Sequence, residues 1–305
     1  MKNEGNSLRA IVFALVGNLL IALIKFVVSA ISGSSAMLAE GIHSMVDTTN
    51  QVFLLIGNKR SAKAADEFHS LGYGKEEYFW GFLVAVLLFF LGGIFSIYEG
   101  IHKYFHPEPI NNFVFIFIVL VISIAIEYKS FSVALTEFRK TNKGPLYQSL
   151  KQSTDTNIFV ILVEDFSALS GLFIVLMSTI LSMFYPIFDV IGTVMVGCLL
   201  IVMSYFLSDE LRKLMIGENI ARPMRKNIKC IVSRYALVRH VNHIRSMYIG
   251  HNKFILLISI DVSDSATGLT IEDNIEQMKV DILKQYPNAQ YIYIDVMDAK
   301  RNQLT

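Results

Sequence analysis

The sequence has few charged residues for its length. Only 17% of its 305 residues are Asp, Glu, Lys or Arg, and 53% are hydrophobic, whereas about 25% charged residues are usual in a soluble domain. A single soluble domain cannot bury that much apolar surface, so the excess must face lipid. The formal net charge is +1, which leaves no basic field over the whole chain to attract nucleic acid. The composition therefore predicts a membrane protein without a nucleic-acid partner.

Cysteine and the common catalytic motifs are scarce or missing. The two cysteines, Cys198 and Cys230, provide no disulfide framework and no CxxC metal motif. The sequence has no P-loop, no GxSxG nucleophile motif and no HExxH motif, so an enzyme is not predicted. The first apolar run is too long for a cleaved signal peptide and is followed by others like it. With a short polar N-terminus and no transit peptide, we expect a multi-pass protein of a prokaryotic inner (cytoplasmic) membrane.

Six apolar stretches are long enough, or nearly so, to cross a bilayer as helices. About 20 helical residues cross 30 Å of hydrocarbon, and the predicted spans are 8–31, 36–57, 78–98, 110–127, 157–183 and 188–207. Basic residues gather before span one and after spans two, four and six, and the other three connectors contain only Lys103. Because basic residues near span ends favour the cytoplasm, both termini are predicted to be cytoplasmic.

The composition becomes that of a soluble domain near residue 217. We therefore predict a transmembrane domain over residues 1–217 and a cytoplasmic domain over residues 218–305. Within the second domain, residues 221–233 and 270–285 have helical patterns, and residues 243–248, 254–262 and 291–296 have strand patterns. The predicted fold is an α-helical membrane protein with six transmembrane helices, followed by a small α+β domain of order α-β-β-α-β. Its open sheet edge or face is available for forming a homodimer.

Ionisable residues inside the predicted spans need a function, because each costs at least about 2.5–3.5 kcal/mol to insert. His43 and Asp47 lie one turn apart on one face of span two, and Glu164 and Asp165 are adjacent in span five. The first pair supplies half of a tetrahedral site for a borderline cation such as zinc, and the span-five carboxylates could complete it. The alternative is a His–Asp hydrogen bond that only links helices, but this leaves Glu40 of the same span unexplained.

Three other charged residues receive structural interpretations. Lys25 of span one could bond to neighbouring helices or reach towards an interface. Glu127, which ends span four beside Lys129, is interpreted as interfacial. Asp189 opens span six, where a carboxylate near a helix N-terminus is stabilised.

The two charged spans, with a small cytoplasmic domain behind them, resemble the cation diffusion facilitator family. Residues 32–47, SGSSAMLAEGIHSMVD, are similar to the family's second-helix signature. Residues 66–77, DEFHSLGYGKEE, resemble its following loop, and residues 214–218 resemble its link to the cytoplasmic domain. The Glu-Asp pair of span five is more similar to the zinc transporter 9 branch than to the common zinc exporters. The resemblance covers nearly the whole chain and implies proton-coupled efflux of zinc or a similar divalent cation by a homodimer, through alternating access.

The resemblance also implies roles for individual residues. His43 and Asp47 match the second-helix ligands, and Asp165 matches the fifth-helix aspartate, but Ile161 stands where histidine is usual. Either Glu164 replaces this ligand, or three protein ligands and a water hold the metal. Less imidazole and more carboxylate favours harder ions such as Mn²⁺ or Fe²⁺, although zinc is still the first expectation.

A second metal site in the loop after span two is implied only weakly. Asp66 and His69 match two of its ligands, but Tyr73 stands where a second histidine would be. The pattern fits a weak site and a solvated loop equally well. Two alternatives to a zinc exporter also stay open. One is a Mn²⁺ or Fe²⁺ exporter of the same fold, and the other is a membrane-anchored metal sensor or scaffold that recruits a partner without transport.

Overall fold

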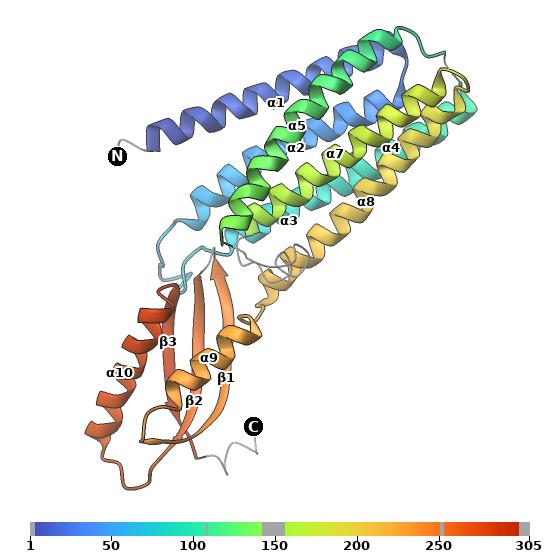
Figure 1. Cartoon of the computed structure of the whole chain (residues 1–305). Helices are drawn as coiled ribbons and strands as arrows, with labels where there is room; N and C mark the ends of the chain where they lie inside the picture. The colour runs from blue at the N-terminus through green and yellow to red at the C-terminus, as the bar shows by residue number, and fades with distance from the viewer. Residues whose placement is uncertain (1–3, 108, 142–155, 251–252, 299–305) are drawn as a thin grey trace. The chain divides into compact units, whose positions relative to one another are not determined.

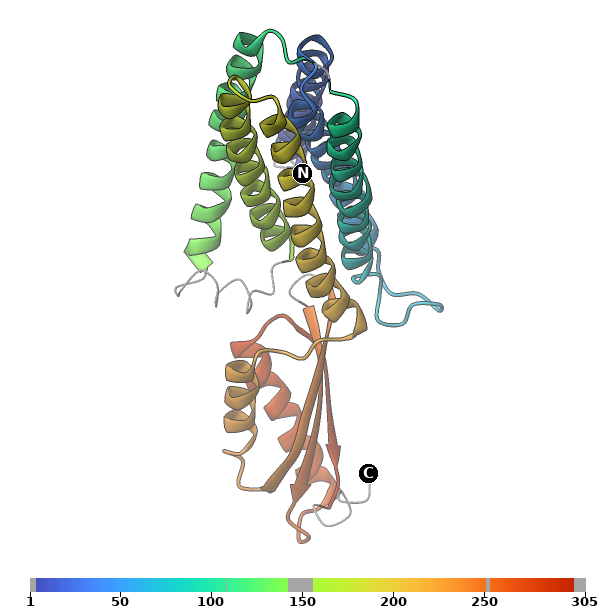
Figure 2. The same ribbon diagram turned by 90° about the vertical axis from the view of Figure 1, so that its right-hand side faces the viewer.

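The computed structural model describes residues 4–107, 109–141, 156–250 and 253–298. The chain forms two compact units (Figures 1 and 2). One comprises residues 1–59 and 78–212, and the other comprises residues 60–77 and 213–305. The sequence did not predict that residues 60–77, a connector between helices, group with the C-terminal unit.

The first unit is built from long helices (Figure 1). In the described part of the chain, four helical segments are apolar and long enough to cross a membrane, namely residues 76–105, 113–139, 161–182 and 187–216. The chain is therefore a multi-pass membrane protein. Within the described residues, the helices of this unit are α1 (Glu4–Ser32), α2 (Ser35–Ser61), α3 (Glu76–Leu87), η1 (Leu88–Ile94), α4 (Phe95–Phe105), α5 (Phe113–Thr141), α7 (Thr156–Ser182) and α8 (Ile187–Ile216), in which η1 is a π-helical segment between α3 and α4.

The predicted count of six spans depends on α1 and α2. These helices have 29 and 27 residues, which is long enough for a bilayer at 1.5 Å per residue. In α1 only residues 18–32 form a described apolar segment, and α2 contains the charged residues of the predicted site. Both helices nevertheless contribute to the buried apolar core of the unit, which is formed by Val28, Ala36, Met37, Ala39, Val46, Leu88, Ile116, Leu120, Leu172, Val175, Val196 and Leu200.

Glycine allows the 76–105 helix to approach α8 closely. A Cβ atom on Gly93 would lie 2.5 Å from the Cγ1 atom of Ile201, and one on Gly197 would lie 2.9 Å from the carbonyl oxygen of Gly93. Real Cβ atoms do not make contacts this short, so neither position accepts a larger residue without a shift of the helices. Small residues at such a contact let two membrane helices pack backbone to backbone.

A buried ion pair connects the turn between α1 and α2 to the start of α8. The Lys103 ammonium lies 2.8 Å from Asp189 Oδ2 and also donates to the carbonyl oxygen of Gly33. Asp189 accepts further hydrogen bonds from the Ser34 hydroxyl, at 2.6 Å, and from the Ser35 backbone N–H, at 2.9 Å. Asp189 thus does more than interact with its own helix N-terminus, because it holds the first residues of α2 in place.

The C-terminal unit contains α9 (Arg222–Val232), β1 (Val238–Gly250), β2 (Lys253–Val262), α10 (Gly268–Gln285) and β3 (Ala289–Val296). The predicted α-β-β-α-β order is confirmed. The sheet order is β1-β2-β3, with β1 antiparallel and β3 parallel to β2. The two helices lie side by side on one face of the sheet (Figures 1 and 2). Strand β1 is longer than the predicted 243–248 because its pairing with β2 starts at Val238.

We expect Asp189→Ala to lower the free energy of unfolding by about 3–5 kcal/mol, because it leaves the Lys103 ammonium buried without its partner. Unfolding in detergent micelles measures the change. The control is Asp264→Ala, which removes the exposed Arg239–Asp264 ion pair and should have almost no effect. Equal stability of the two variants would show that the buried pair does not stabilise the bundle.

Candidate metal centre

The imidazole of His43 is buried in the first unit without a hydrogen-bond partner. Its side chain is only 1% exposed, and neither ring nitrogen has a hydrogen-bond partner among the residues that the structure describes. Its Nε2 atom lies 3.7 Å from Asp47 Oδ2, one helical turn further along α2. Buried polar groups nearly always have partners. An imidazole with two free nitrogens beside a carboxylate is therefore suited to binding a cation or a proton.

The two adjacent carboxylates of α7 point in different directions, as expected for neighbours on a helix. Glu164 accepts a hydrogen bond from the Asn50 amide of α2. Asp165 accepts a hydrogen bond of 2.9 Å from the Ser130 hydroxyl of α5. Glu164 is thereby directed towards the helix that carries His43 and Asp47, whereas Asp165 is directed towards α5.

The four predicted ligands share one electrostatic region but do not form a closed cage. Asp47 interacts electrostatically with Asp165, and Glu164 interacts with both. Within the described residues, however, no three His, Cys, Asp or Glu side chains converge closely enough to hold a metal ion. The structure pairs His43 with Asp47 and places the α7 carboxylates nearby without bringing them to one centre.

Glu127 is an additional carboxylate of this region. Its helix continues to Thr141, so Glu127 lies in the middle of α5 rather than at its end. It interacts electrostatically with Asp47, Asp165 and His43. The fall in hydropathy at Glu127 and Lys129 suggested the end of a span, although the helix continues through it.

A second buried ion pair explains why a charged Glu40 is tolerated inside the bundle. The Lys25 ammonium of α1 lies 3.1 Å from Glu40 Oε2 and donates to the Ser44 hydroxyl at 2.7 Å. The Lys25 and Glu40 side chains are 1% and 0% exposed, so Lys25 does not reach an interface. Ser44 is the residue after His43, and Lys25 interacts electrostatically with both His43 and Asp47. The Lys25–Glu40 ion pair therefore lies beside the predicted metal ligands.

Gly171 of α7 makes room for the Glu40 carboxylate. A Cβ atom at this position would lie 2.6 Å from Glu40 Oε1, and this oxygen has no hydrogen-bond partner. The Lys25–Glu40 pair is thus enclosed by three helices, α1, α2 and α7. Since α2 and α7 also carry the predicted ligands, the pair fixes the surroundings of the candidate site.

In the loop after α2, Asp66 uses its oxygens for the loop itself. Its Oδ1 atom accepts hydrogen bonds from the backbone N–H groups of Phe68 and His69, and its Oδ2 atom accepts one of 2.6 Å from the Tyr73 hydroxyl. These bonds, that from Tyr73 first, hold the pKa of Asp66 below its usual value. The His69 ring lies 4.1 Å from the Tyr73 ring. Tyr73 therefore closes the loop at the position where the resemblance would place a third ligand.

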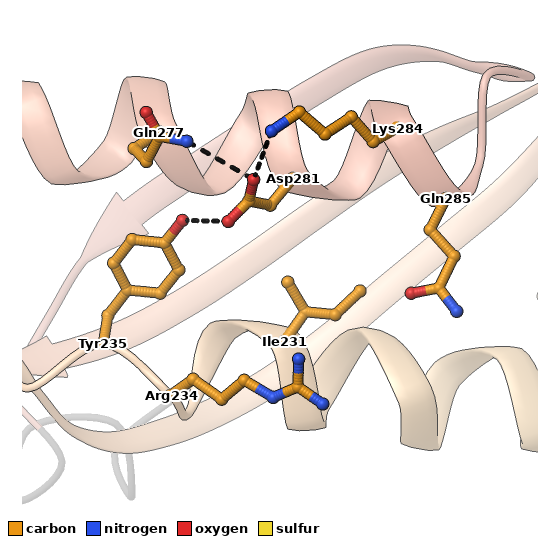
Figure 3. A pocket seen from close by; sticks show the side chains of 7 residues that line it. All are labelled: Ile231, Arg234, Tyr235, Gln277, Asp281, Lys284 and Gln285. Carbon is orange, nitrogen blue, oxygen red and sulfur yellow. Dashed lines mark hydrogen bonds and ion pairs between the residues drawn. The ribbon is translucent and has the colours of Figure 1, made fainter.

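A cavity of about 760 Å³ in the C-terminal unit lies between α9 and α10, and none of the predicted metal ligands lines it. In Figure 3 the Asp281 carboxylate accepts hydrogen bonds from Tyr235, Gln277 and Lys284. The Tyr235 hydrogen bond, followed by that of Lys284, lowers the pKa of Asp281. Desolvation, followed by the hydrogen bond to Asp281, raises the pKa of Tyr235 to about 12.

Comparison with known proteins places these features in a family. A model of the cation efflux transmembrane domain matches residues 11–215. The chain is 28% identical over 266 residues to the mitochondrial proton-coupled zinc antiporter SLC30A9 of Xenopus laevis, covering 86% of this chain and 47% of that protein. It is 30% identical over 264 residues to metal tolerance protein C4 of Arabidopsis thaliana, covering 85% and 58%. The chain spans about half the length of these relatives.

One further match covers nearly all of this chain, and another covers only a quarter of it. The manganese efflux system protein MneP of Bacillus subtilis (strain 168) is 20% identical over 297 residues, with 97% of both chains covered. Among solved structures, a cadmium form of the C-terminal domain of MamM matches 25% of this chain at 17% identity and a TM-score of 0.24, covering 94% of that chain.

We expect Gly171→Ala to lower the free energy of unfolding by about 1–3 kcal/mol, because the added methyl group displaces the Glu40 carboxylate. Gly268→Ala is the matched control, since a Cβ atom there has nothing within 4 Å. The cost of Gly171→Ala should disappear in a Lys25→Met, Glu40→Ala background, which removes the group that the methyl meets. An undiminished cost in that background would contradict the assignment.

A pH-dependent stability contribution is expected from Tyr235 and Asp281. Because the pKa of Asp281 is lowered in the folded state, its contribution is present above the ordinary aspartate pKa and is lost as the pH falls through the folded pKa. Tyr235→Phe should therefore destabilise the protein at neutral pH and lose its effect in acid. Unfolding measured against pH tests this, with Tyr293→Phe, at an exposed residue, as a control that should show no such dependence.

Proposed function

Because the chain belongs to the cation efflux family, we propose that it exports a divalent metal cation, zinc in the first place, in exchange for protons. The family consists of transporters, so the chain is not an enzyme. The observation that carries the proposal is the buried His43 imidazole with two free nitrogens, beside Asp47 and within a group of carboxylates inside the bundle. The relative in Xenopus laevis, named a proton-coupled zinc antiporter, supports the choice of cargo and counter-ion.

In this proposal His43, Asp47, Glu164 and Asp165 form the transport site. His43 and Asp47 already face each other on α2, and Asn50 directs Glu164 towards that helix. Asp165 reaches the site if α7 turns it away from Ser130. This chain has Ile161 where a histidine ligand is usual, and Glu164 then serves as the ligand instead. The open arrangement corresponds to a site that closes around the ion when the ion arrives.

Proton coupling follows from the chemistry of the ligands. A carboxylate or imidazole must lose its proton to bind a metal, so binding releases protons and proton uptake releases the metal. His43 suits this exchange because one imidazole nitrogen can bind either a proton or a metal ion. The Lys25–Glu40 ion pair lies beside these ligands and adds no net charge to the empty site. Alternating access of the site to the two sides of the membrane would then give exchange of metal for protons.

We further propose six spans, with α1 and α2 included, both termini in the cytoplasm, and a homodimer in a prokaryotic inner membrane. The distribution of basic residues supports this orientation. Asp66 and His69 do not form part of the proposed transport machinery, since Asp66 is engaged within its own loop.

Manganese is the second candidate cargo. The site is rich in carboxylates and contains one histidine, which favours harder ions than the common zinc sites. The relative in Bacillus subtilis is named a manganese efflux protein and matches over 97% of this chain. Glu164→His should shift the preference towards zinc, because it restores imidazole to the site.

Flux of Zn²⁺ and Mn²⁺ into proteoliposomes under an imposed pH gradient tests the proposal. We expect gradient-driven flux in the wild type and background flux in Asp47→Ala and Asp165→Ala. The exposed Asp264→Asn is the control and should transport normally. Flux of Mn²⁺ without Zn²⁺ would assign the second cargo. If neither these ions nor Fe²⁺ moved, the transporter function would be wrong and a sensor or scaffold would be favoured.

A further inference from the structure

Helix α9 of the C-terminal unit presents a stripe of basic side chains on its exposed face. The stripe consists of Arg222, Arg225, Lys226 and Lys229, which are spaced at i, i+3, i+4 and i+7 and therefore share one face of the helix. All four residues are exposed. The opposite face is apolar, and its Ile228, Ile231 and Val232 are buried. Among the described residues, none of the four basic side chains has an ion pair or side-chain hydrogen bond.

Charge in the C-terminal unit is strongly separated along the sequence. Residues 219–260 contain no acidic residue, and their basic residues are Arg222, Arg225, Lys226, Lys229, Arg234, Arg239, Arg245 and Lys253. Acidic residues predominate in residues 261–298. Surfaces of soluble domains usually mix the two signs. A stripe of one sign with no carboxylate between its members is suited to a partner that carries many negative charges.

The covalent chain keeps α9 near the end of a membrane helix. Helix α8 ends at Ile216 and α9 begins at Arg222, so at most about 20 Å of extended chain separates the two ends. The linker is held against β1, because Glu218 accepts a hydrogen bond from the Tyr248 N–H and Asn219 accepts one from the Ser246 N–H. The covalent chain therefore tethers the first residue of the stripe within about 20 Å of the end of α8.

We propose that the basic stripe of α9 docks on the anionic lipid headgroups of the leaflet at which α8 ends. Clusters of Lys and Arg directly after a membrane helix bind such headgroups, and each residue near the surface changes the binding equilibrium about fivefold. The proposal rests on the part of the proposed function in which α8 crosses the membrane. Lipid is favoured over single-stranded nucleic acid because α9 has no aromatic side chain on which bases could stack.

The exposed thiol of Cys230, which follows the stripe directly, reports whether α9 is covered. In a Cys198→Ala background it is the only thiol of the chain. The full-length protein is placed in nanodiscs of phosphatidylcholine alone or with added phosphatidylglycerol, and the rate of labelling with an uncharged maleimide is measured. We expect labelling to be at least about fivefold slower in the anionic discs. This difference should disappear at 1 M salt, where the screening length falls to about 3 Å.

Two matched controls separate docking from a general charge effect. Replacing Arg225, Lys226 and Lys229 with Gln should abolish the lipid dependence, whereas replacing Arg239, Arg245 and Lys253 with Gln removes the same charge and should preserve it. A reporter at Gln290→Cys, with Cys230→Ala, should be labelled equally in both lipids.

Three results would overturn the proposal. The first is equal labelling of Cys230 in both lipids. The second is an equal loss of lipid dependence in the two triple variants. The third is protection that also occurs in phosphatidylcholine alone and depends on a second copy of the chain or on added RNA. None of these readouts requires metal transport, so a failure of docking is distinguishable from a failure of the transporter function.

Discussion

The cost of placing charge inside a membrane protein is the constraint on which the helical unit depends. Lys25 and Glu40 are almost fully buried and are tolerable only as a pair, and the same is true of Lys103 and Asp189. The first pair lies at the level of the candidate site, and the second fixes the turn that begins α2. Together they determine how the helix that carries His43 and Asp47 is held. The site itself differs, because its carboxylates have few positive partners and therefore favour a cation from outside.

Local spacing predicted the parts of this arrangement that one helix contains. The spacing of His43 and Asp47 implied contact across one turn, and adjacency implied that Glu164 and Asp165 diverge. The α-β-β-α-β order also followed from local patterns. The partners of Lys25 and Asp189 could not be predicted, because they depend on how separate helices are rotated against each other. Periodicity within one helix carries no information on that rotation. The contacts of Glu127 with the site residues also depend on helix rotation, and its interfacial position stays a prediction because a helix can continue past the end of a span.

The role of Tyr73 shows why a pattern match is weaker than a contact. At the sequence level it interrupts a possible set of ligands. In the structure the Tyr73 hydroxyl donates a hydrogen bond to Asp66, so this residue stabilises the conformation of the loop. A similar distinction applies to Glu164, whose partner Asn50 lies on the ligand-bearing face of α2. Tyr73 thus contributes a hydrogen bond to the loop, and Glu164 contributes a carboxylate near the candidate ligands of α2.

The contact between Gly93 and Gly197 has a mechanical consequence. Where two backbones touch, no layer of flexible side chains lies between them to absorb a displacement. Sliding one helix past the other would press Ile201 into the backbone of its neighbour, or open a void that nothing in the bundle fills. At this contact the 76–105 helix and α8 are therefore packed too closely for an easy displacement of one against the other. A relative displacement of helices near the candidate site is therefore more easily accommodated between this closely packed pair and α2 or α7, which carry His43, Asp47, Glu164 and Asp165.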